Sequence, residues 1–208
     1  MKALVLFSGT GSVCKVLKRR GYEVVSIDDE SGFIKRKELE SLGTTIITDI
    51  MSWDYKKYKH FDCIWASPPC KFYSCLLKCF KPKEDHEPSY LKGDVFVKKT
   101  LEIIDHFKPK QWFIENPRTG ALRSRPFMQS LQYVDVDYCQ FGFLYQKPTR
   151  IWHDGSNEIK DKKCVRSKCE ACIVSARLED SSTKIVRLKA LMDKKGFVGE
   201  ICIEFQRS

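Results

Sequence analysis

Two short segments place a reactive side chain directly after an apolar run. Residues 61–66 form an apolar run of strand type, and a Pro-Pro-Cys step ending at Cys70 follows. Proline cannot donate to a sheet ladder, so the strand must stop there and hold the thiol at its end. Residues 111–114 form a second such run and lead into Glu115 and Asn116, again followed by proline. A thiol and a carboxyl group at two neighbouring strand ends could attack a ring and protonate it.

Strand-like and helix-like patterns alternate through the first three quarters of the chain. We predict strands at 2–7, 22–27, 44–48, 61–66, 111–114 and 133–138, and helices at 12–20, 34–42, 94–107 and about 120–131. This alternation indicates an α/β fold with a mostly parallel sheet and helices on both faces. In such sheets ligands bind at the carboxyl ends of the strands. Residues 71–92 show little periodicity and are expected to form a loop that faces the substrate.

Length and composition favour one domain with a small appendage. Of the 208 residues, we assign 1–153 to a catalytic domain and 154–208 to a short Cys-rich extension. Within that extension we expect a helix near 184–195 and a strand near 199–205. No apolar run approaches the roughly 20 residues that span a bilayer, and the first residues lack the pattern of a secretory signal. We therefore expect a cytoplasmic protein without a membrane partner.

The chain carries a formal net charge of +10. Excess lysine and arginine attract polyanions such as nucleic acids, although a lysine-rich solvated surface would give the same composition.

The turn after the first predicted strand favours a nucleotide-type ligand. Residues 7–11 read Phe-Ser-Gly-Thr-Gly, and a helix follows whose free amides can bind anions. The second predicted strand ends at Asp28, which suits ribose hydroxyls, and the third ends at Asp49, which suits an adenine amino group. Either aspartate alone could be an ordinary turn residue.

Taken together, these segments resemble the cytosine-C5 methyltransferases that use S-adenosylmethionine. The resemblance covers about residues 1–153 and rests on Leu6-Phe7-Ser8-Gly9-Thr10-Gly11, Pro68-Pro69-Cys70, Glu115-Asn116-Pro117, Tyr138 to Gly142, and Gln146-Lys147-Pro148-Thr149-Arg150. It implies the Rossmann-like S-adenosylmethionine-dependent methyltransferase fold, in a compact form like that of phage and large-virus proteins. The cofactor contacts that it implies are Phe7, Ser8, Gly9, Gly11, Asp28, Asp49 and Pro68.

The resemblance also implies four catalytic residues. Cys70 would attack C6 of cytosine, so that C5 can accept a methyl group. Glu115, protonated or sharing a proton with N3, would offset the charge that develops on the ring. Asn116 would hold the loop, and Arg150 would orient the cytosine carbonyl or Glu115. Proline stands at position 148, where the family often carries another arginine.

DNA is the methyl acceptor that the resemblance implies, with its cytosine flipped out of the stack. Lys71, Phe72 and Tyr73 are then candidates for phosphate and base contacts. RNA or a free cytosine nucleotide is an alternative acceptor, and an inactive nucleic-acid-binding or regulatory protein is a third interpretation. Only about 55 residues follow the last motif, where bacterial DNA enzymes carry a long recognition region. A partner protein could supply that recognition.

A cysteine cluster in the extension suggests a metal. Zinc favours four Cys or His ligands in a tetrahedron. Surface thiols and disulfides are the alternatives. The candidate ligands are Cys164, Cys169 and Cys172, with His153 as the nearest fourth and Cys139, Cys75 or Cys79 as further possibilities.

Overall fold

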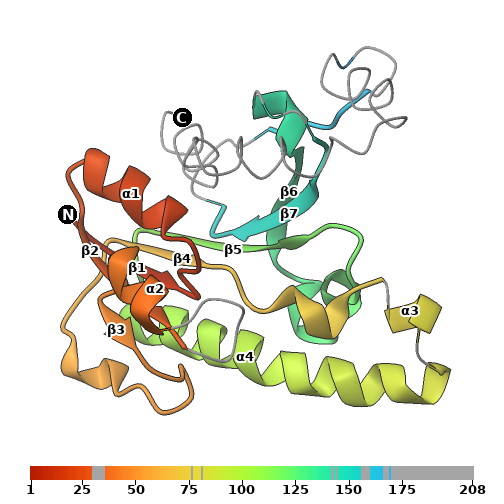
Figure 1. Ribbon diagram of the computed structural model, residues 1–208, viewed down its shortest axis with the longest axis horizontal. Helices are drawn as coiled ribbons and strands as arrows, with labels where there is room; N and C mark the ends of the chain where they lie inside the picture. The colour runs from red at the N-terminus through yellow and green to blue at the C-terminus, as the bar shows by residue number, and fades with distance from the viewer. Residues whose placement is uncertain are drawn as a thin grey trace.

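The fold is a seven-stranded mixed sheet with helices on both faces, as the sequence predicts. This is a computed structural model that describes residues 1–29, 36–75, 77–80, 82–141, 143, 145–155, 160–165 and 169. Its strands are β1 (Lys2–Leu6), β2 (Glu23–Asp28), β3 (Ile46–Ile47), β4 (Cys63–Ala66), β5 (Gln111–Pro117), β6 (Gln132–Asp137) and β7 (Pro148–His153). They lie in the order β3-β2-β1-β4-β5-β7-β6 (Figure 1). The first five are parallel, and β7 runs antiparallel to both of its neighbours.

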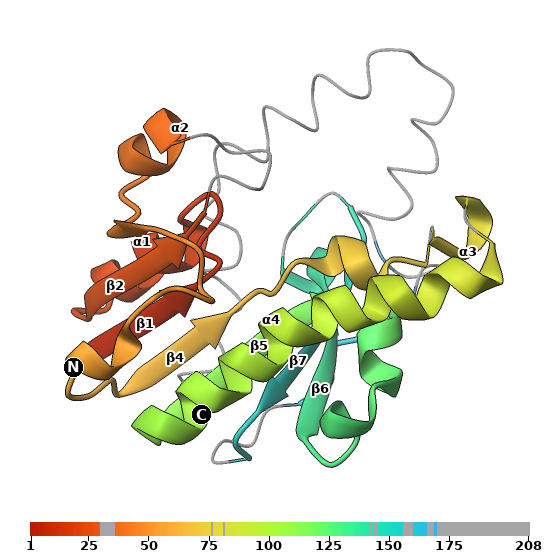
Figure 2. The same ribbon diagram turned by 90° about the horizontal axis from the view of Figure 1, so that it is seen from below.

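Helices cover the two faces of the sheet unequally. The described α-helices are α1 (Ser12–Arg19), α2 (Arg36–Ser41), α3 (Leu77–Phe80) and α4 (His86–Phe107). Helix α1 packs its buried Val13, Val16 and Leu17 on one face. Helix α4 crosses the opposite face, where Val97 and Ile103 are fully buried (Figures 1 and 2). Short 3-10 helices complete the described part: η1 (Tyr55–Lys57), η2 (Cys70–Tyr73), η3 (Lys83–Asp85), η4 (Ala121–Ser124), η5 (Pro126–Met128) and η6 (Tyr138–Phe141).

The prediction of a loop at 71–92 is wrong over most of that range. It contains η2, α3 and η3, and α4 begins at His86 rather than near residue 94. Gly93 resembles a helix breaker in the sequence, yet it lies inside α4 and is buried. A Cβ there would lie 2.7 Å from Cζ of Tyr73, so glycine lets the helix approach the segment 70–73 closely.

Two other elements differ from expectation. The predicted helix at 120–131 is the pair η4 and η5, and β7 was not anticipated as a strand. The helix near 184–195 and the strand near 199–205 lie outside the described residues, so the division at residue 153 stays a prediction.

A buried polar network fixes η2 on α4. The Tyr73 hydroxyl donates to Asp94 Oδ1 (2.9 Å), and the Arg125 guanidinium donates to Asp94 (2.6 Å) and to Glu87 (2.9 Å). Asp94 is only 2% exposed, and a buried carboxylate is costly unless it is paired in this way. The network therefore anchors the segment that begins with Cys70.

Part of the C-terminal extension returns to the sheet. The Lys162 amide donates to the Asp135 carbonyl (3.0 Å), and the Asp137 amide donates to the Lys162 carbonyl (2.9 Å). Residues 160–165 therefore line the outer edge of β6 through a parallel bridge between Val136 and Lys162. Among the helices described, none combines the length and the apolar character that crossing a bilayer requires.

Candidate active site

The glycine turn after β1 is shaped to admit a ligand. Phe7, Gly9 and Gly11 all have positive φ angles (58°, 51° and 68°). A Cβ on Gly11 would lie 3.0 Å from the Leu42 carbonyl oxygen, so this position requires glycine. A Cβ on Gly9 would meet nothing within 4 Å, so the turn leaves open space beside its backbone. A ligand can approach the main chain at that point.

Asp28 ties this turn to the end of β2. Its carboxylate accepts hydrogen bonds from the backbone amides of Gly9 and Asp29. Burial raises the pKa of Asp28, while these amide hydrogen bonds lower it. Ser8 is buried beneath the turn, with its hydroxyl 3.3 Å from that of Thr44. Each carboxylate oxygen has a second lone pair, which remains suited to a ribose hydroxyl.

Asp49 lies just beyond β3 at the same edge of the sheet. It is exposed, and its Oδ1 accepts a hydrogen bond from the Met51 amide (2.9 Å). Because β1, β2 and β3 are parallel, the glycine turn, Asp28 and Asp49 all follow the carboxyl ends of their strands. Their donors and acceptors fit a ligand with a ribose and an adenine.

The Pro-Pro-Cys step is joined to β5 by a hydrogen bond. The Asn116 side-chain amide donates to the Pro68 carbonyl (2.9 Å), and Asn116 is 1% exposed. Its Oδ1 is buried and accepts no hydrogen bond from the residues that the structure describes. Beside it lies a cavity of about 50 Å³ that is lined by Cys70, Ser74, Cys75, Asn116, Pro117, Thr119 and Gly120. The sequence-predicted thiol and amide therefore share one cavity.

Glu115 and Cys70 influence each other electrostatically. Cys70 is exposed, but desolvation of its thiol raises the pKa, and the Glu115 charge raises it further. The Lys147 ammonium acts in the opposite direction. Glu115 is 7% exposed and accepts hydrogen bonds from Lys147 Nζ and the Tyr138 hydroxyl (both 3.3 Å). The charges of Glu115 and Lys147 therefore both act on the Cys70 thiol.

Arg150 does not join this pair. Its guanidinium donates two hydrogen bonds to Asp135 on β6 (2.7 and 3.0 Å) and lies 3.5 Å from the centre of the Tyr133 ring. In the β5–β7 register Arg150 is opposite Asn116, whereas Glu115 is opposite Ile151. Successive strand residues point to opposite faces, so Arg150 and Glu115 face away from each other. The expectation that Arg150 orients Glu115 does not agree with this arrangement.

Lys147 and Tyr138 take the place beside Glu115 that we expected for Arg150. Lys147 Nζ lies 3.4 Å from the Tyr138 hydroxyl and 4.8 Å from the centre of its ring. Both residues belong to the motifs quoted above. Lys147 directly precedes β7, and its place beside Glu115 follows from the pairing of β7 with β5, which no local pattern in the sequence reveals.

We expect Lys147→Met to raise the pH at which Cys70 becomes reactive. Because the lysine charge lowers the pKa of this thiol, its removal leaves less thiolate at any given pH. The midpoint of Cys70 alkylation, followed by mass spectrometry of its peptide, should move to higher pH, with a roughly threefold to tenfold slower reaction near neutrality. Lys110→Met is the control, because Lys110 pairs with Asp62 at the far end of the strands. Equal midpoints in both variants would contradict this role.

The three candidate nucleic-acid contacts differ in their surroundings. Lys71 is exposed, with Nζ 5.2 Å from the centre of the Phe72 ring. Phe72 is half-buried and stacks on Phe96 of α4 (5.8 Å), which also meets the ring of Phe7 edge-on (6.3 Å). Tyr73 is 1% exposed, so it does not serve as an open platform for a base. Burial within the network with Asp94 explains this correction.

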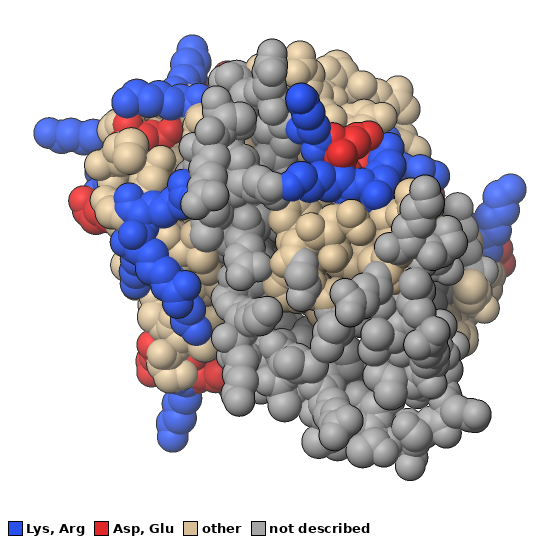
Figure 3. Space-filling view, turned by 90° about the horizontal axis from the view of Figure 1, so that it is seen from above, with Lys and Arg blue, Asp and Glu red and all other residues tan. Residues whose placement is uncertain are grey.

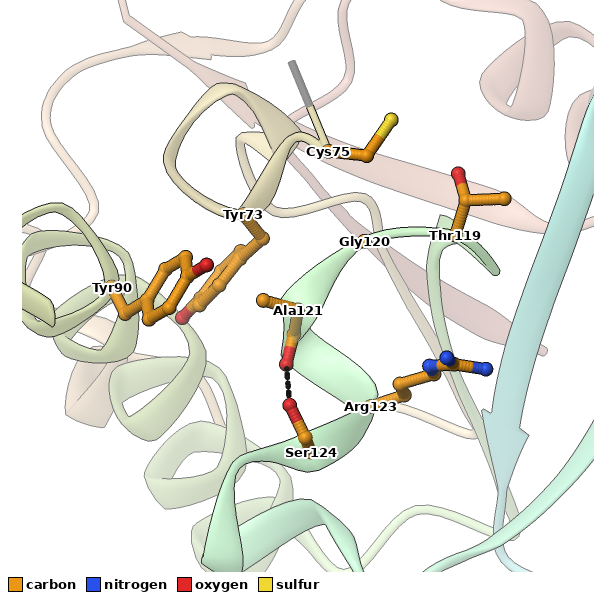
Figure 4. A pocket seen from close by; sticks show the side chains of 8 residues that line it. All are labelled: Tyr73, Cys75, Tyr90, Thr119, Gly120, Ala121, Arg123 and Ser124. Carbon is orange, nitrogen blue, oxygen red and sulfur yellow. Dashed lines mark hydrogen bonds between the residues drawn. The ribbon is translucent and has the colours of Figure 1, made fainter. Parts of the chain in front are cut away.

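A larger cavity adjoins the one at Cys70 and shares Cys75, Thr119 and Gly120 with it. It has a volume of about 220 Å³ (Figure 4). The edge of Tyr73 and the ring of Tyr90 border one side of it, and the exposed Arg123 borders the other. Its walls combine aromatic surface with a cation, groups that can contact a base and a phosphate.

Positive side chains lie in separate groups on the face that Figure 3 shows. Lysine and arginine side chains extend along the left of Figure 3, the side on which Figure 1 shows α1, and a second group lies at the upper right among acidic residues. Lys18 and Arg19 belong to the last turn of α1. Such a distribution supports general attraction of a polyanion.

The predicted zinc ligands are only partly brought together. Cys164 and Cys169 lie with Cys139, and the three sulfurs are all within 4.8 Å of one another. His153 pairs with Gln132 at the opposite end of β7 from Cys139, so it is not the fourth ligand of this group. Its Nδ1 accepts a hydrogen bond from the Gly155 amide (3.0 Å) instead. Cys172 lies outside the described residues.

Comparison with known proteins gives a sequence relative and similar folds. No family model matches the chain. A frog virus 3 (isolate Goorha) protein named "Probable DNA (cytosine-5)-methyltransferase" is 33% identical over 165 residues, covering 74% of this chain and 71% of that protein. An E. coli structure described as a "putative DNA modification methyltransferase encoded within prophage" has a TM-score of 0.51 at 14% identity, over 74% of this chain and 46% of that one. A mutant DNMT2 of Spodoptera frugiperda has a TM-score of 0.51 at 16% identity, over 79% and 55%. The chain thus matches about half the length of these two structures.

Proposed function

Because the chain belongs to the DNA (cytosine-5)-methyltransferase family, we propose that it methylates C5 of cytosine in DNA through a covalent bond between Cys70 and C6. The observation that carries this proposal is the meeting of three groups at one strand edge. Cys70 and Asn116 line the same cavity, and the charge of Glu115 acts on the Cys70 thiol. Cys70 follows β4, and Glu115 lies in the adjacent parallel strand β5. A nucleophile and an acid are the groups that this reaction needs.

S-adenosylmethionine is the methyl donor that the family implies, and it would supply an electrophilic methyl group. The turn from Phe7 to Gly11, Asp28 and Asp49 would hold its adenosine part, and Pro68 would lie near its methionine end. The open space beside Gly9 and the paired amides at Asp28 support this assignment. The ring of Phe96 packs against the rings of both Phe7 and Phe72, so α4 fixes the position of the glycine turn relative to the segment that begins with Cys70.

Each residue of the pair then has a distinct task. Attack of the Cys70 thiolate on C6 forms an S–C bond and moves electron density through the ring to C5. A protonated Glu115 donates to N3 and offsets the negative charge that develops there. After C5 has been methylated, a base removes the C5 proton and the S–C bond breaks, which regenerates the thiolate. Asn116 positions the Pro-Pro-Cys step through the Pro68 carbonyl.

Lys147 acts on both groups of this pair. Its ammonium contacts the Glu115 carboxyl group at 3.3 Å, and its charge lowers the pKa of the Cys70 thiol. A cytosine that enters between Cys70 and Glu115 would replace water and offer N3 as an acceptor.

We further propose that a partner protein contributes to the selection of the target sequence. The chain matches 46% and 55% of the lengths of the two similar structures. A cytosine in RNA or a free nucleotide would place smaller demands on recognition.

Methyl transfer from radiolabelled cofactor to three acceptors tests the function. Duplex DNA, RNA and dCMP should be supplied separately to the full chain, with direct measurement of cofactor binding in parallel. Label at C5 of cytosine in DNA is the expected result. Label in RNA or dCMP alone would overturn the choice of acceptor. Cofactor binding without any transfer would favour an inactive, nucleic-acid-binding scaffold.

A further inference from the structure

We propose that Cys139, Cys164 and Cys169 bind a structural zinc ion that fastens the C-terminal extension to the active-site wall. Their three sulfurs lie within 4.8 Å of one another. Zinc held by thiolates at about 2.3 Å sets neighbouring sulfurs roughly 3.8 Å apart in a tetrahedron. Rotation of side chains and a small closure therefore suffice to bring these three sulfurs to a common ion.

The backbone already brings the ligands together without the metal. Cys139 is in η6 directly after β6, and residues 160–165 return along the outer edge of that strand. The Cys164 amide donates to the Asp137 carboxylate (2.8 Å), which fixes Cys164 beside the start of η6. The segment lies close to η6 in Figure 1.

Burial of the sulfurs favours a metal over surface thiols. Cys139 and Cys169 are each 8% exposed, and Cys164 is half-buried against them. The Gln140 amide points at Cys139 Sγ (3.8 Å) and Cys169 Sγ (4.0 Å), as expected for a donor to metal-bound thiolates. A disulfide would use two of the three sulfurs, which leaves the third buried beside it.

Residues 160–165 gain little stability from burial, so a cross-link would help to hold them in place. Within residues 160–165 most side chains are exposed, and Val165 is 59% exposed. A segment that buries so little apolar surface gains little from the hydrophobic effect, and metal binding commonly replaces a core in such cases. Three thiolates leave one tetrahedral position for a further ligand.

The position of the cluster connects it to the proposed chemistry. Cys139 follows Tyr138, whose hydroxyl donates to Glu115 Oε1 and lies near Lys147. Asp135 and Asp137, which hold the returning segment, also pair with Arg150 and Arg118. A zinc ion here would therefore stiffen β6, η6 and the start of β7, the elements behind the acid.

Metal analysis of the full chain tests the site without any need for activity. Protein from zinc-supplemented expression should contain about one zinc per chain. Cobalt(II) exchanged into it should give a thiolate-to-cobalt charge-transfer band. Removal of zinc by a chelator should lower the midpoint of thermal unfolding.

Single serine variants at Cys139, Cys164 and Cys169 should each bind zinc at least about a hundredfold more weakly. Cys79→Ser is the matched control, because Cys79 is an exposed cysteine on α3 outside the cluster. The cobalt spectrum of the unmodified chain remains informative if a variant fails to fold. Zinc retained in all three variants would overturn the proposal. So would a metal-free protein, or one whose mass is lowered by the two hydrogens of a disulfide.

Discussion

Cys70→Ser abolishes covalent capture of DNA that contains 5-fluorocytosine. In the unmodified protein the fluorine at C5 cannot leave as a proton does, so the S–C6 bond should persist after methyl transfer. A serine hydroxyl is a much weaker nucleophile than a thiolate, so we expect methyl transfer to fall by at least about 10³-fold. Denaturing electrophoresis of the complex with labelled DNA and cofactor measures the adduct, and radiolabel transfer measures the rate.

Two observations indicate that Cys70→Ser leaves the fold intact. Cys70 is exposed at the start of η2, and Tyr73, not Cys70, anchors that helix to Asp94. The thermal midpoint and cofactor binding should therefore stay unchanged. Cys79→Ser controls for loss of an exposed thiol and should form the adduct normally. An adduct that survives Cys70→Ser would show that another group attacks the ring.

Glu115→Gln should slow methyl transfer and accelerate the alkylation of Cys70. Methyl transfer should fall by about 10²- to 10⁴-fold, because an amide cannot share a proton with N3 as a carboxylic acid can. Alkylation of Cys70 should become faster at neutral pH. The negative charge of Glu115 raises the pKa of this thiol, so its removal lowers that pKa and increases the thiolate fraction. Steady-state transfer and the pH dependence of alkylation supply the two measurements.

A purely structural role for Glu115 predicts a different outcome. Loss of a structural contact would lower the thermal midpoint and slow both reactions, or neither. Glu102→Gln is the control. Glu102 lies on α4 away from the site, where it pairs with Lys99 of the same helix and with Tyr55 of η1. Transfer that stays at the unmodified rate in Glu115→Gln would remove this residue from the mechanism.

Proline-marked strand ends made much of this site visible in the sequence. The two prolines that follow the β4 run and the single proline that closes β5 fix where each strand stops, so Cys70 and Glu115 could be assigned to one sheet edge. The glycine turn could also be predicted from a local pattern, because its positive φ angles restrict the residue type. The family and the fold follow from such local constraints, and both are confirmed.

The remaining features depend on contacts between distant segments. Gly93 lowers helix propensity, and its value appears only where α4 meets the ring of Tyr73. Arg150 lies in the expected motif, but its partner Asp135 is set by the pairing of β6 with β7, a strand that begins at a proline. Lys147 could be placed beside Glu115 only once that register was known. No local pattern predicts which of several cysteines, Cys139 included, will meet Cys164.

The short return of residues 160–165 has a consequence for the behaviour of the protein in solution. β6 is one of the two edge strands of the sheet, and an uncovered edge strand is a template on which another chain can extend the sheet. Here the amides of Asp135 and Asp137 on that side are already occupied by Asp161 and Lys162. Residues 160–165 thereby keep this edge of the sheet from pairing with another chain, a role that is separate from any part in the reaction.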